Sequence, residues 1–147
     1  MVDSAMDLLL EQAEQEEEQA QLSLVAAQQA LENYLKQIDQ IEQYRLEYFR
    51  TLSEQGLHGL SANKYSHLNR FITQLDETLV KQRGAVSEFE KNVEQCREHW
   101  QGCRARTRAL AWLIEKRARE ALKKAEKAEQ KQQDEFAVLA YLRQKKR

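Results

Sequence analysis

The sequence predicts an all-α protein, a long antiparallel two-helix coiled-coil hairpin whose second helix overhangs at the C-terminal end. The 147 residues contain no Pro and only four Gly, too few to punctuate many turns. Long tracts of Ala, Leu, Glu, Gln, Lys and Arg are typical of extended helices. Apolar residues recur every three or four positions, which argues against disorder despite a charged fraction of 32%. We expect a single domain, residues 1–147, with helices at about 3–54 and 61–142 and a turn at about 55–60.

The first helix is predicted by a heptad repeat, whose a and d positions form the apolar seam of a coiled coil. The a positions are Leu10, Glu17, Leu24, Leu31, Ile38, Arg45 and Leu52, and the d positions are Met6, Ala13, Ala20, Ala27, Tyr34, Ile41 and Tyr48. Only Glu17 and Arg45 are charged, so the repeat indicates one continuous buried face.

The repeat stops at "SEQGLHGLSANKY", residues 53–65, which holds two of the four glycines. Either Gly56 or Gly59 can adopt the left-handed conformation that ends a helix. Ser61 can cap the following helix by accepting a hydrogen bond from a free backbone N–H. A short turn of this kind makes the two helices antiparallel neighbours.

The second helix resumes the same period after the turn. Its predicted seam is Tyr65, Leu68, Ile72, Leu75, Leu79, Gln82, Val86, Phe89, Val93, Cys96, Trp100, Cys103, Thr107, Leu110 and Ile114. Gly84 and Gly102 lie inside the run and each costs about 1 kcal/mol of helix propensity, which a long packed helix tolerates.

Charge is divided between the two ends of the chain. Residues 1–53 carry eleven acids and three bases, whereas residues 104–147 carry six acids and fourteen bases. A turn centred near residue 57 would set residue i opposite residue 114 − i and place the acids of the first helix beside bases of the second. These are Glu11, Glu14, Glu16, Glu17 and Glu18 on one side and Arg97, Arg104, Arg106 and Arg108 on the other. Such pairs help to set register, although each exposed pair contributes only about 0–1 kcal/mol.

On this register, the helix beyond about residue 114 has no partner within the chain. Its seam fades into alanines, yet an apolar group reappears at the very end. This group consists of Phe136, Ala137, Val138, Leu139, Tyr141 and Leu142. With nothing inside the molecule to cover it, the group predicts a binding partner.

No pattern predicts catalysis, so we expect neither an enzyme nor a cofactor. Cys96, His99 and Cys103 share a helical face, but one straight helix cannot bring residues i and i+7 to a single zinc ion. The two cysteines therefore indicate small buried residues rather than a metal site. No secretory signal or membrane-spanning segment is visible, and we expect a reducing cytoplasm and no direct membrane insertion.

The arm from Arg104 to Lys131 is basic, a composition that can neutralise the phosphates of a nucleic acid. Its bases are interleaved with glutamates, and it has few aromatic residues on which bases could stack. These glutamates are Glu115, Glu120, Glu126 and Glu129. We therefore expect no nucleic-acid partner, and a salt-sensitive nucleic-acid-binding hairpin is the third alternative.

Two apolar and aromatic rows lie close to the turn, at the steps i, i+4, i+7 and i+11. The first row is Gln37, Ile41, Tyr44 and Tyr48, and the second is Phe71, Leu75, Thr78 and Gln82. Tyr44 and Phe71 fall outside the seam, so we expect them to be exposed. Exposed aromatic residues are candidates for contact with another protein.

The chain resembles the FliJ family of bacterial flagellar type III export proteins over essentially its whole length. The resemblance rests on the acidic first helix, on "QIDQIEQYRLEYFR" (37–50), on "SANKYSHLNRFITQLDETL" (61–79) after the turn, and on "QKQQDEFA" (130–137). The order and spacing of these segments carry it.

The resemblance implies a cytoplasmic, non-catalytic stalk, similar to the coiled coil of the ATP synthase gamma subunit, at the inner membrane of the flagellar base. The implied partners are the hexameric export ATPase, the export-gate membrane protein through its cytoplasmic domain, and export chaperones. The family's gate-binding positions match Gln37, Ile41, Tyr44, Tyr48, Phe71 and Leu75, whereas Thr78 and Gln82 depart from the family pattern. The overhanging end is expected to bind the ATPase ring through Asp134, Glu135, Phe136, Leu139 and Leu142. The alternatives are the equivalent stalk of a virulence type III injectisome and a self-associating structural coiled coil.

Overall fold

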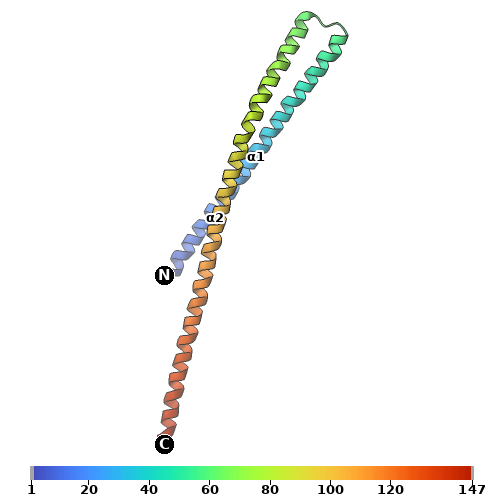
Figure 1. The fold of residues 1–147 in the computed structure, drawn as a ribbon. Coiled ribbons are helices and arrows are strands. Elements are labelled where there is room, and N and C mark those ends of the chain that lie inside the picture. The colour runs from blue at the N-terminus through green and yellow to red at the C-terminus, as the bar shows by residue number, and fades with distance from the viewer. Residues whose placement is uncertain (1, 147) are drawn as a thin grey trace. The chain divides into compact units, whose positions relative to one another are not determined.

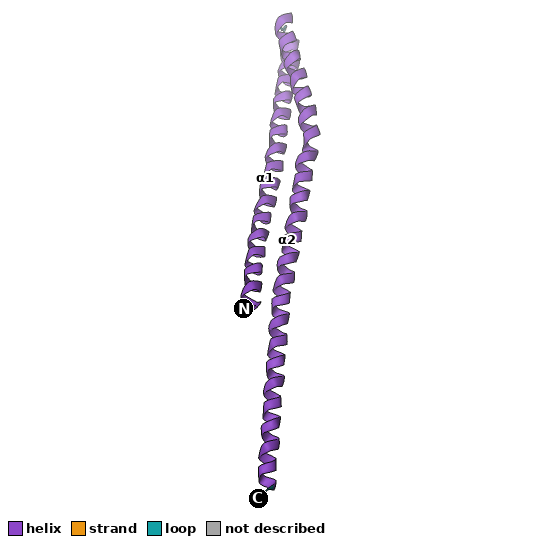
Figure 2. Ribbon diagram, turned by 90° about the vertical axis from the view of Figure 1, so that its left-hand side faces the viewer, coloured by secondary structure: helices purple, strands orange, loops and turns teal. Residues whose placement is uncertain are grey.

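The fold consists of two long α-helices joined by one turn. A computed structural model describes residues 2–146, with α1 at Val2–Leu57 and α2 at Ala62–Lys145 (Figure 1). Helices account for all regular secondary structure in this described range (Figure 2). The predicted all-α coiled-coil hairpin is therefore confirmed.

The chain forms two compact units. The hairpin unit is Glu18–Gln101 and contains the turn, and the end unit combines the described parts of Met1–Glu17 and Gly102–Arg147. Within the hairpin unit, α1 and α2 run antiparallel and side by side in both views (Figures 1 and 2).

The turn occupies residues 58–61, at the late edge of the range expected from the sequence. Gly59 has a φ of +86°, which is the left-handed conformation that ends α1 and favours glycine. The Ser61 hydroxyl accepts a hydrogen bond from the Lys64 backbone N–H at 3.3 Å and so caps α2. The chain thus uses one of the two candidate glycines, together with the predicted capping serine.

The heptad seam predicts burial accurately along α1. All fourteen a and d residues of α1 are buried or half-buried, and on α2 only Tyr65 among the fifteen predicted seam residues is exposed, at 50%. In the hairpin unit, a core cluster forms around Leu24, Ala27 and Val93. Leu31, Cys96 and Trp100 pack against this cluster.

The core is nevertheless thin. The chain exposes 12107 Å², whereas a globular protein of its mass exposes about 7,800 Å². Since only one helix covers each seam, even the most buried side chains retain some exposure. Most side chains of this protein therefore contact solvent, so its binding sites lie on the surface of the helices.

Polar cross-helix contacts add to the seam in the hairpin unit. The Tyr34 ring stacks on Phe89, with ring centroids 4.3 Å apart, and its hydroxyl donates to the Gln82 carbonyl at 3.0 Å. Arg45, the charged residue at an a position, pairs with Asp76 of α2. These contacts tie specific residues together and therefore define the register, as polar residues at a positions do in coiled coils.

The register differs from the one estimated from the sequence. The register can be expressed as the sum of the residue numbers of two facing residues. This sum is 121 for Arg45 and Asp76, and 122 for Glu16 and Arg106 in the end unit. The sequence led us to expect a sum of 114. The centre of the turn lies later than residue 57. Each residue by which this centre moves along the chain changes the number of the facing residue on α2 by two. The helix without a partner consequently begins near residue 120 rather than 114.

In the end unit, the start of α1 packs on α2, and Ala13 there is 1% exposed. Glu16 accepts a hydrogen bond from the Arg106 guanidinium at 3.2 Å, and the Thr107 hydroxyl lies 3.3 Å from the Ala13 carbonyl. In the hairpin unit, Arg97, which we expected to face acids of α1, instead pairs with Glu94 of its own helix at 2.9 Å. Residues 115–146 are exposed at every position, and from about residue 120 α2 continues past the start of α1 with no helix beside it (Figures 1 and 2).

Candidate binding surfaces

The first candidate surface lies in the hairpin unit and combines both helices near the turn. We call it the tyrosine patch, and it consists of Gln37, Ile41, Tyr44, Tyr48, Phe71 and Leu75. The Tyr48 and Phe71 rings meet edge to face across the two helices, with centroids 4.7 Å apart and planes at 66°. This contact brings the α1 row and the α2 row into one continuous surface.

The members of the tyrosine patch differ in exposure. Tyr44 is 56% exposed and Phe71 is 41% exposed, as their positions outside the seam predicted. Gln37 is also exposed, whereas Ile41, Tyr48 and Leu75 are half-buried seam residues. Tyr44 is therefore available to a partner without a structural role, while Phe71 serves both the surface and the interhelical contact.

Thr78 and Gln82 are the two positions that depart from the family pattern, and both make contacts within the protein. The Thr78 hydroxyl donates to the Gln74 carbonyl one turn earlier in α2 at 2.9 Å. Gln82 is half-buried, and its backbone carbonyl accepts the Tyr34 hydroxyl. Its side-chain Oε1 is buried and has no hydrogen-bond partner in the structure. Gln82 therefore belongs to the contact between the two helices, and the tyrosine patch ends before Gln82 along α2.

The second candidate surface is the C-terminal tip of α2 in the end unit. Of the residues predicted there, Asp134 and Glu135 are exposed, and the exposed fractions of Phe136, Leu139 and Leu142 are 76%, 59% and 50%. The sequence prediction left out Val138 and Tyr141 as contact residues, although they are exposed at 58% and 63%. A helical wheel would have found them, because a step of 100° per residue places them on the opposite side from Phe136. The tip, defined as residues 134–142, is therefore apolar around most of its circumference.

Neither surface has the features of a catalytic or metal site. Among the described residues, no group of three or more His, Cys, Asp or Glu side chains is arranged to hold a metal ion. Cys96 and Cys103 are half-buried seam residues, which fits their expected role as small packing groups. Within residues 2–146, neither helix contains a segment long and apolar enough to cross a membrane.

Known proteins resemble this chain over its whole length. The family model of the flagellar FliJ protein matches residues 2–146. The flagellar FliJ protein of Escherichia coli is 25% identical over 139 residues, which are 95% of each chain. The flagellar FliJ protein of Salmonella typhi is 24% identical with the same coverage.

A solved structure supports the fold. A protein of Chlamydia trachomatis described as a YscO homologue matches with a TM-score of 0.52 at 22% identity, over 99% of this chain and 94% of its own. Together with the family match over residues 2–146, the paired heptad seams lead to one conclusion: the chain belongs to the flagellar FliJ protein family and is a component of the flagellar type III export apparatus.

Proposed function

We propose that this protein is a non-catalytic, stalk-like adaptor of flagellar export. Its C-terminal tip binds the hexameric export ATPase and promotes its activity, and its tyrosine patch binds the cytoplasmic domain of the export-gate membrane protein. Export chaperones are further partners. The protein acts in the cytoplasm, at the inner membrane of the flagellar base.

The observation that carries the proposal is the exposed apolar tip. A helix that is apolar on all sides is normally buried on all sides. Phe136, Val138, Leu139, Tyr141 and Leu142 are instead each at least half exposed, with no other helix of the end unit beside them. Burying such a side chain contributes about 1.5–3 kcal/mol, so a partner that encloses the helix gains several such contributions at once. A ring of subunits around a central opening offers this kind of enclosure, whereas a one-sided groove covers only part of it.

The tyrosine patch supports the second contact. Tyr and Phe are side chains on which binding energy concentrates in protein interfaces, because they bury a large area with few rotatable bonds. Tyr44 and Phe71 expose such area on one surface. The ring contact between Phe71 and Tyr48 joins the two helices at this surface. The patch and the tip lie in different units of the chain, so one molecule offers two separate docking surfaces.

The first test measures ATP hydrolysis by the purified export ATPase in the presence of this protein. Deletion of residues 130–147, or the triple substitution Phe136→Ser, Leu139→Ser and Leu142→Ser, should abolish stimulation while circular dichroism shows the hairpin still folded. The matched control is Val80→Ser, because Val80 is an exposed apolar residue of α2 in the hairpin unit, at 72%. Stimulation that survives the tip variants would contradict the proposed role of the tip.

The second test measures binding to the cytoplasmic domain of the export gate by calorimetry. Tyr44→Ala should weaken binding at least about tenfold, the loss of a typical interface hot spot, and leave the melting temperature unchanged. Phe71→Ala should weaken binding and also lower stability by about 0.5–1.5 kcal/mol, because it removes the ring contact with Tyr48. If Tyr44→Ala bound the gate normally, the patch would have to serve another partner.

A further inference from the structure

The two flanks of the seam in the hairpin unit differ in charge. In a coiled coil, the residue directly after each d position and the residue directly before each a position border the seam on opposite sides, and both often carry charges that pair between the helices. On the first of these sides, Glu42 pairs with Arg83 at 3.0 Å and Asp76 pairs with Arg45. Glu90 lies on the same side. This flank therefore has the composition of a coiled coil that faces water.

The positions that border the seam on the opposite side carry no charge, although 32% of the whole chain is charged. They directly precede a positions on α1 and the equivalent seam residues on α2, and they recur every seven residues. The row continues at this spacing through Ser23 and Thr51 on α1 and Phe71 on α2, which are also uncharged. We name the central six residues the neutral flank: Ala30, Gln37 and Tyr44 on α1, and Thr78, Ala85 and Asn92 on α2.

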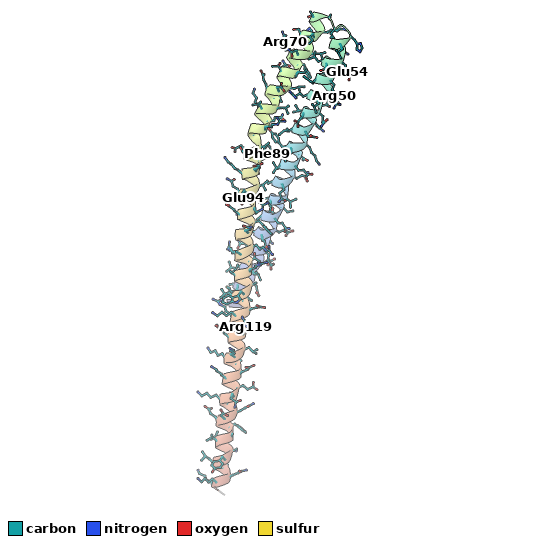
Figure 3. The ribbon with its side chains drawn as sticks, turned by 45° about the vertical axis from the view of Figure 1, so that its right-hand side comes forward. Arg50, Glu54, Arg70, Phe89, Glu94 and Arg119 are labelled. Atoms are coloured by element: carbon teal, nitrogen blue, oxygen red, sulfur yellow. The ribbon has the colours of Figure 1, made fainter. Side chains whose placement is uncertain are left out.

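The residues of the neutral flank face one another across the seam in three pairs. The residue numbers of each pair add up to 122, between the sums of 121 for Arg45 and Asp76 and 123 for the stacked rings of Tyr34 and Phe89. Phe89, labelled in Figure 3, fills the seam between the second pair and the pair farthest from the turn. The three pairs therefore form one row over the seam: Tyr44 with Thr78, Gln37 with Ala85, and Ala30 with Asn92.

A partner should cover the neutral flank at a lower cost than the charged one. Five of its residues are exposed and Ala85 is half-buried, and none holds a charge that would lose its hydration under a partner. Four of the six are Ala, Thr or Asn, which let another backbone come close, since the spacing of packed helices depends on the side chains at the contact. Glu47, Lys81 and Glu88 lie one row further from the seam, where they would border a covering helix rather than lie beneath it.

We propose that one helix of the cytoplasmic domain of the export gate lies along the neutral flank, over the line where α1 and α2 meet, with no charged residue on its contact face. This inference rests on the proposed function of the tyrosine patch, because Gln37 and Tyr44 belong to both surfaces. The neutral flank extends that patch away from the turn as far as Ala30 and Asn92. From Tyr44 to Ala30 it covers about 21 Å, the length of about four helical turns.

The pattern of the flank favours a helix of the gate over other occupants. Its pairs recur every seven residues, which is two helical turns, so a helix laid along it meets each pair with the same apolar stripe at i, i+3, i+4 and i+7. A charged contact face would lose its hydration over residues that offer no opposite charge. A second copy of this chain docked here would cover Tyr44 and close the tyrosine patch to the gate, whereas a helix of the gate uses both surfaces together.

The first measurement places charge on the neutral flank outside the tyrosine patch. Ala30→Arg together with Asn92→Arg should weaken calorimetric binding of the gate domain at least about tenfold, because the partner would cover two charges that have no counter-charge. The matched control is Gln28→Arg together with Ser87→Arg, two exposed residues on the charged side of the seam, and it should bind like the original chain. Both double variants should keep the original melting temperature by circular dichroism, since none of these four side chains is buried.

The second measurement identifies the occupant by photo-crosslinking. Benzoylphenylalanine replaces Ala30 in one full-length chain and Tyr44 in another, and mass spectrometry locates the adducts formed with the gate domain. Both probes should label one segment of the gate domain, at points about fourteen residues apart, because a helix along the flank advances about 1.5 Å per residue. A probe at Gln28, on the charged side of the seam, should label this segment much less.

The outcomes separate this inference from the proposed function. Normal binding by the Ala30→Arg and Asn92→Arg variant, with binding weakened by Tyr44→Ala, would overturn the role of the neutral flank and leave the tyrosine patch in place. Adducts between two copies of this chain would assign the flank to a second copy and also overturn the inference. If Tyr44→Ala bound normally as well, or the original chain did not bind the gate domain, the proposed gate contact itself would fail and the inference with it.

Discussion

Two stretches of this chain share the same helical backbone but are stabilised differently. In the hairpin unit, apolar residues keep to one seam on each helix, and residues such as Leu24 and Val93 are more than nine-tenths buried. In the lone stretch of α2, residues 120–146, every residue is exposed, and apolar side chains lie on all sides at the tip. Long helices in water gain most of their stability from packing. The hairpin unit therefore holds the fold, and the lone stretch is surface available for association.

Backbone protection should show the largest difference between the two stretches. Amides in the lone stretch of α2 should exchange with solvent at least about a hundred times faster than those around Leu24 and Val93, because local opening there breaks no packing. Hydrogen exchange followed by mass spectrometry measures both in one experiment. Limited trypsin digestion should likewise cut first between Lys116 and Lys131. Equal protection along α2 would show that the lone stretch is covered in solution.

The same substitution in the two stretches should differ by several kcal/mol. Leu24→Ala removes a side chain that is 8% exposed from the core cluster and should lower the free energy of unfolding by about 2–4 kcal/mol. Leu122→Ala removes one that is 61% exposed and should change it by less than about 0.5 kcal/mol. Urea unfolding followed by circular dichroism measures both. A large loss from Leu122→Ala would mean that this side chain is packed in solution.

Removal of one hydroxyl group should give a smaller difference. Tyr34→Phe keeps the ring stack on Phe89 but removes the hydrogen bond to the Gln82 carbonyl, at a cost of about 0.5–1.5 kcal/mol. Tyr141→Phe, at the 63% exposed Tyr141, should cost nothing measurable. Thermal unfolding of the two variants beside the original chain gives the comparison. If Tyr34→Phe were neutral, water would be satisfying the Gln82 carbonyl equally well.

The smallest expected effect concerns surface charge. Glu16→Gln breaks the ion pair with Arg106, whose side chains are 45% and 53% exposed, and should cost at most about 1 kcal/mol at low salt. Screening should remove even this cost at about 1 M salt. Glu126→Gln in the lone stretch, where Glu126 forms no ion pair with a described residue, is the matched control and should change nothing in either buffer. A salt-independent loss would indicate that Glu16 acts through packing rather than charge.

The seam was predictable because it depends on local periodicity, which the sequence displays directly. The register was not, although the polar residues that fix it were visible. The observed register differs from the estimate by about seven in the partner's number, which is one heptad. A slip of one heptad leaves every a and d residue in the seam, so the apolar pattern cannot distinguish the two registers. Only the positions of Gly59 and Ser61 in the turn, and pairs such as Arg45–Asp76, decide between them.

The candidate surfaces were predictable to the extent that exposure follows from the seam. Tyr44 and Phe71 lie outside it and are exposed, and the tip lies beyond the end of the partner helix. The ring contact between Tyr48 and Phe71 could not be predicted, because it depends on the register that the heptad pattern left open. What binds each surface is a property of the partner, and the roles of both surfaces remain predictions.

The single turn also determines the order in which this chain can fold. Tyr48 and Phe71 meet close to the turn, whereas Ala13 and Thr107 are 94 residues apart in sequence. Closing a long loop costs more entropy than closing a short one. We therefore expect pairing of the two helices to begin next to Gly59 and to proceed away from the turn, so that the start of α1 pairs with α2 last. Synthesis runs the other way: the start of α1 leaves the ribosome before the segment of α2 that it contacts, so it is the last part of α1 to find its partner. Until Thr107 emerges, Ala13 lacks the contact with α2 that it makes in the folded chain.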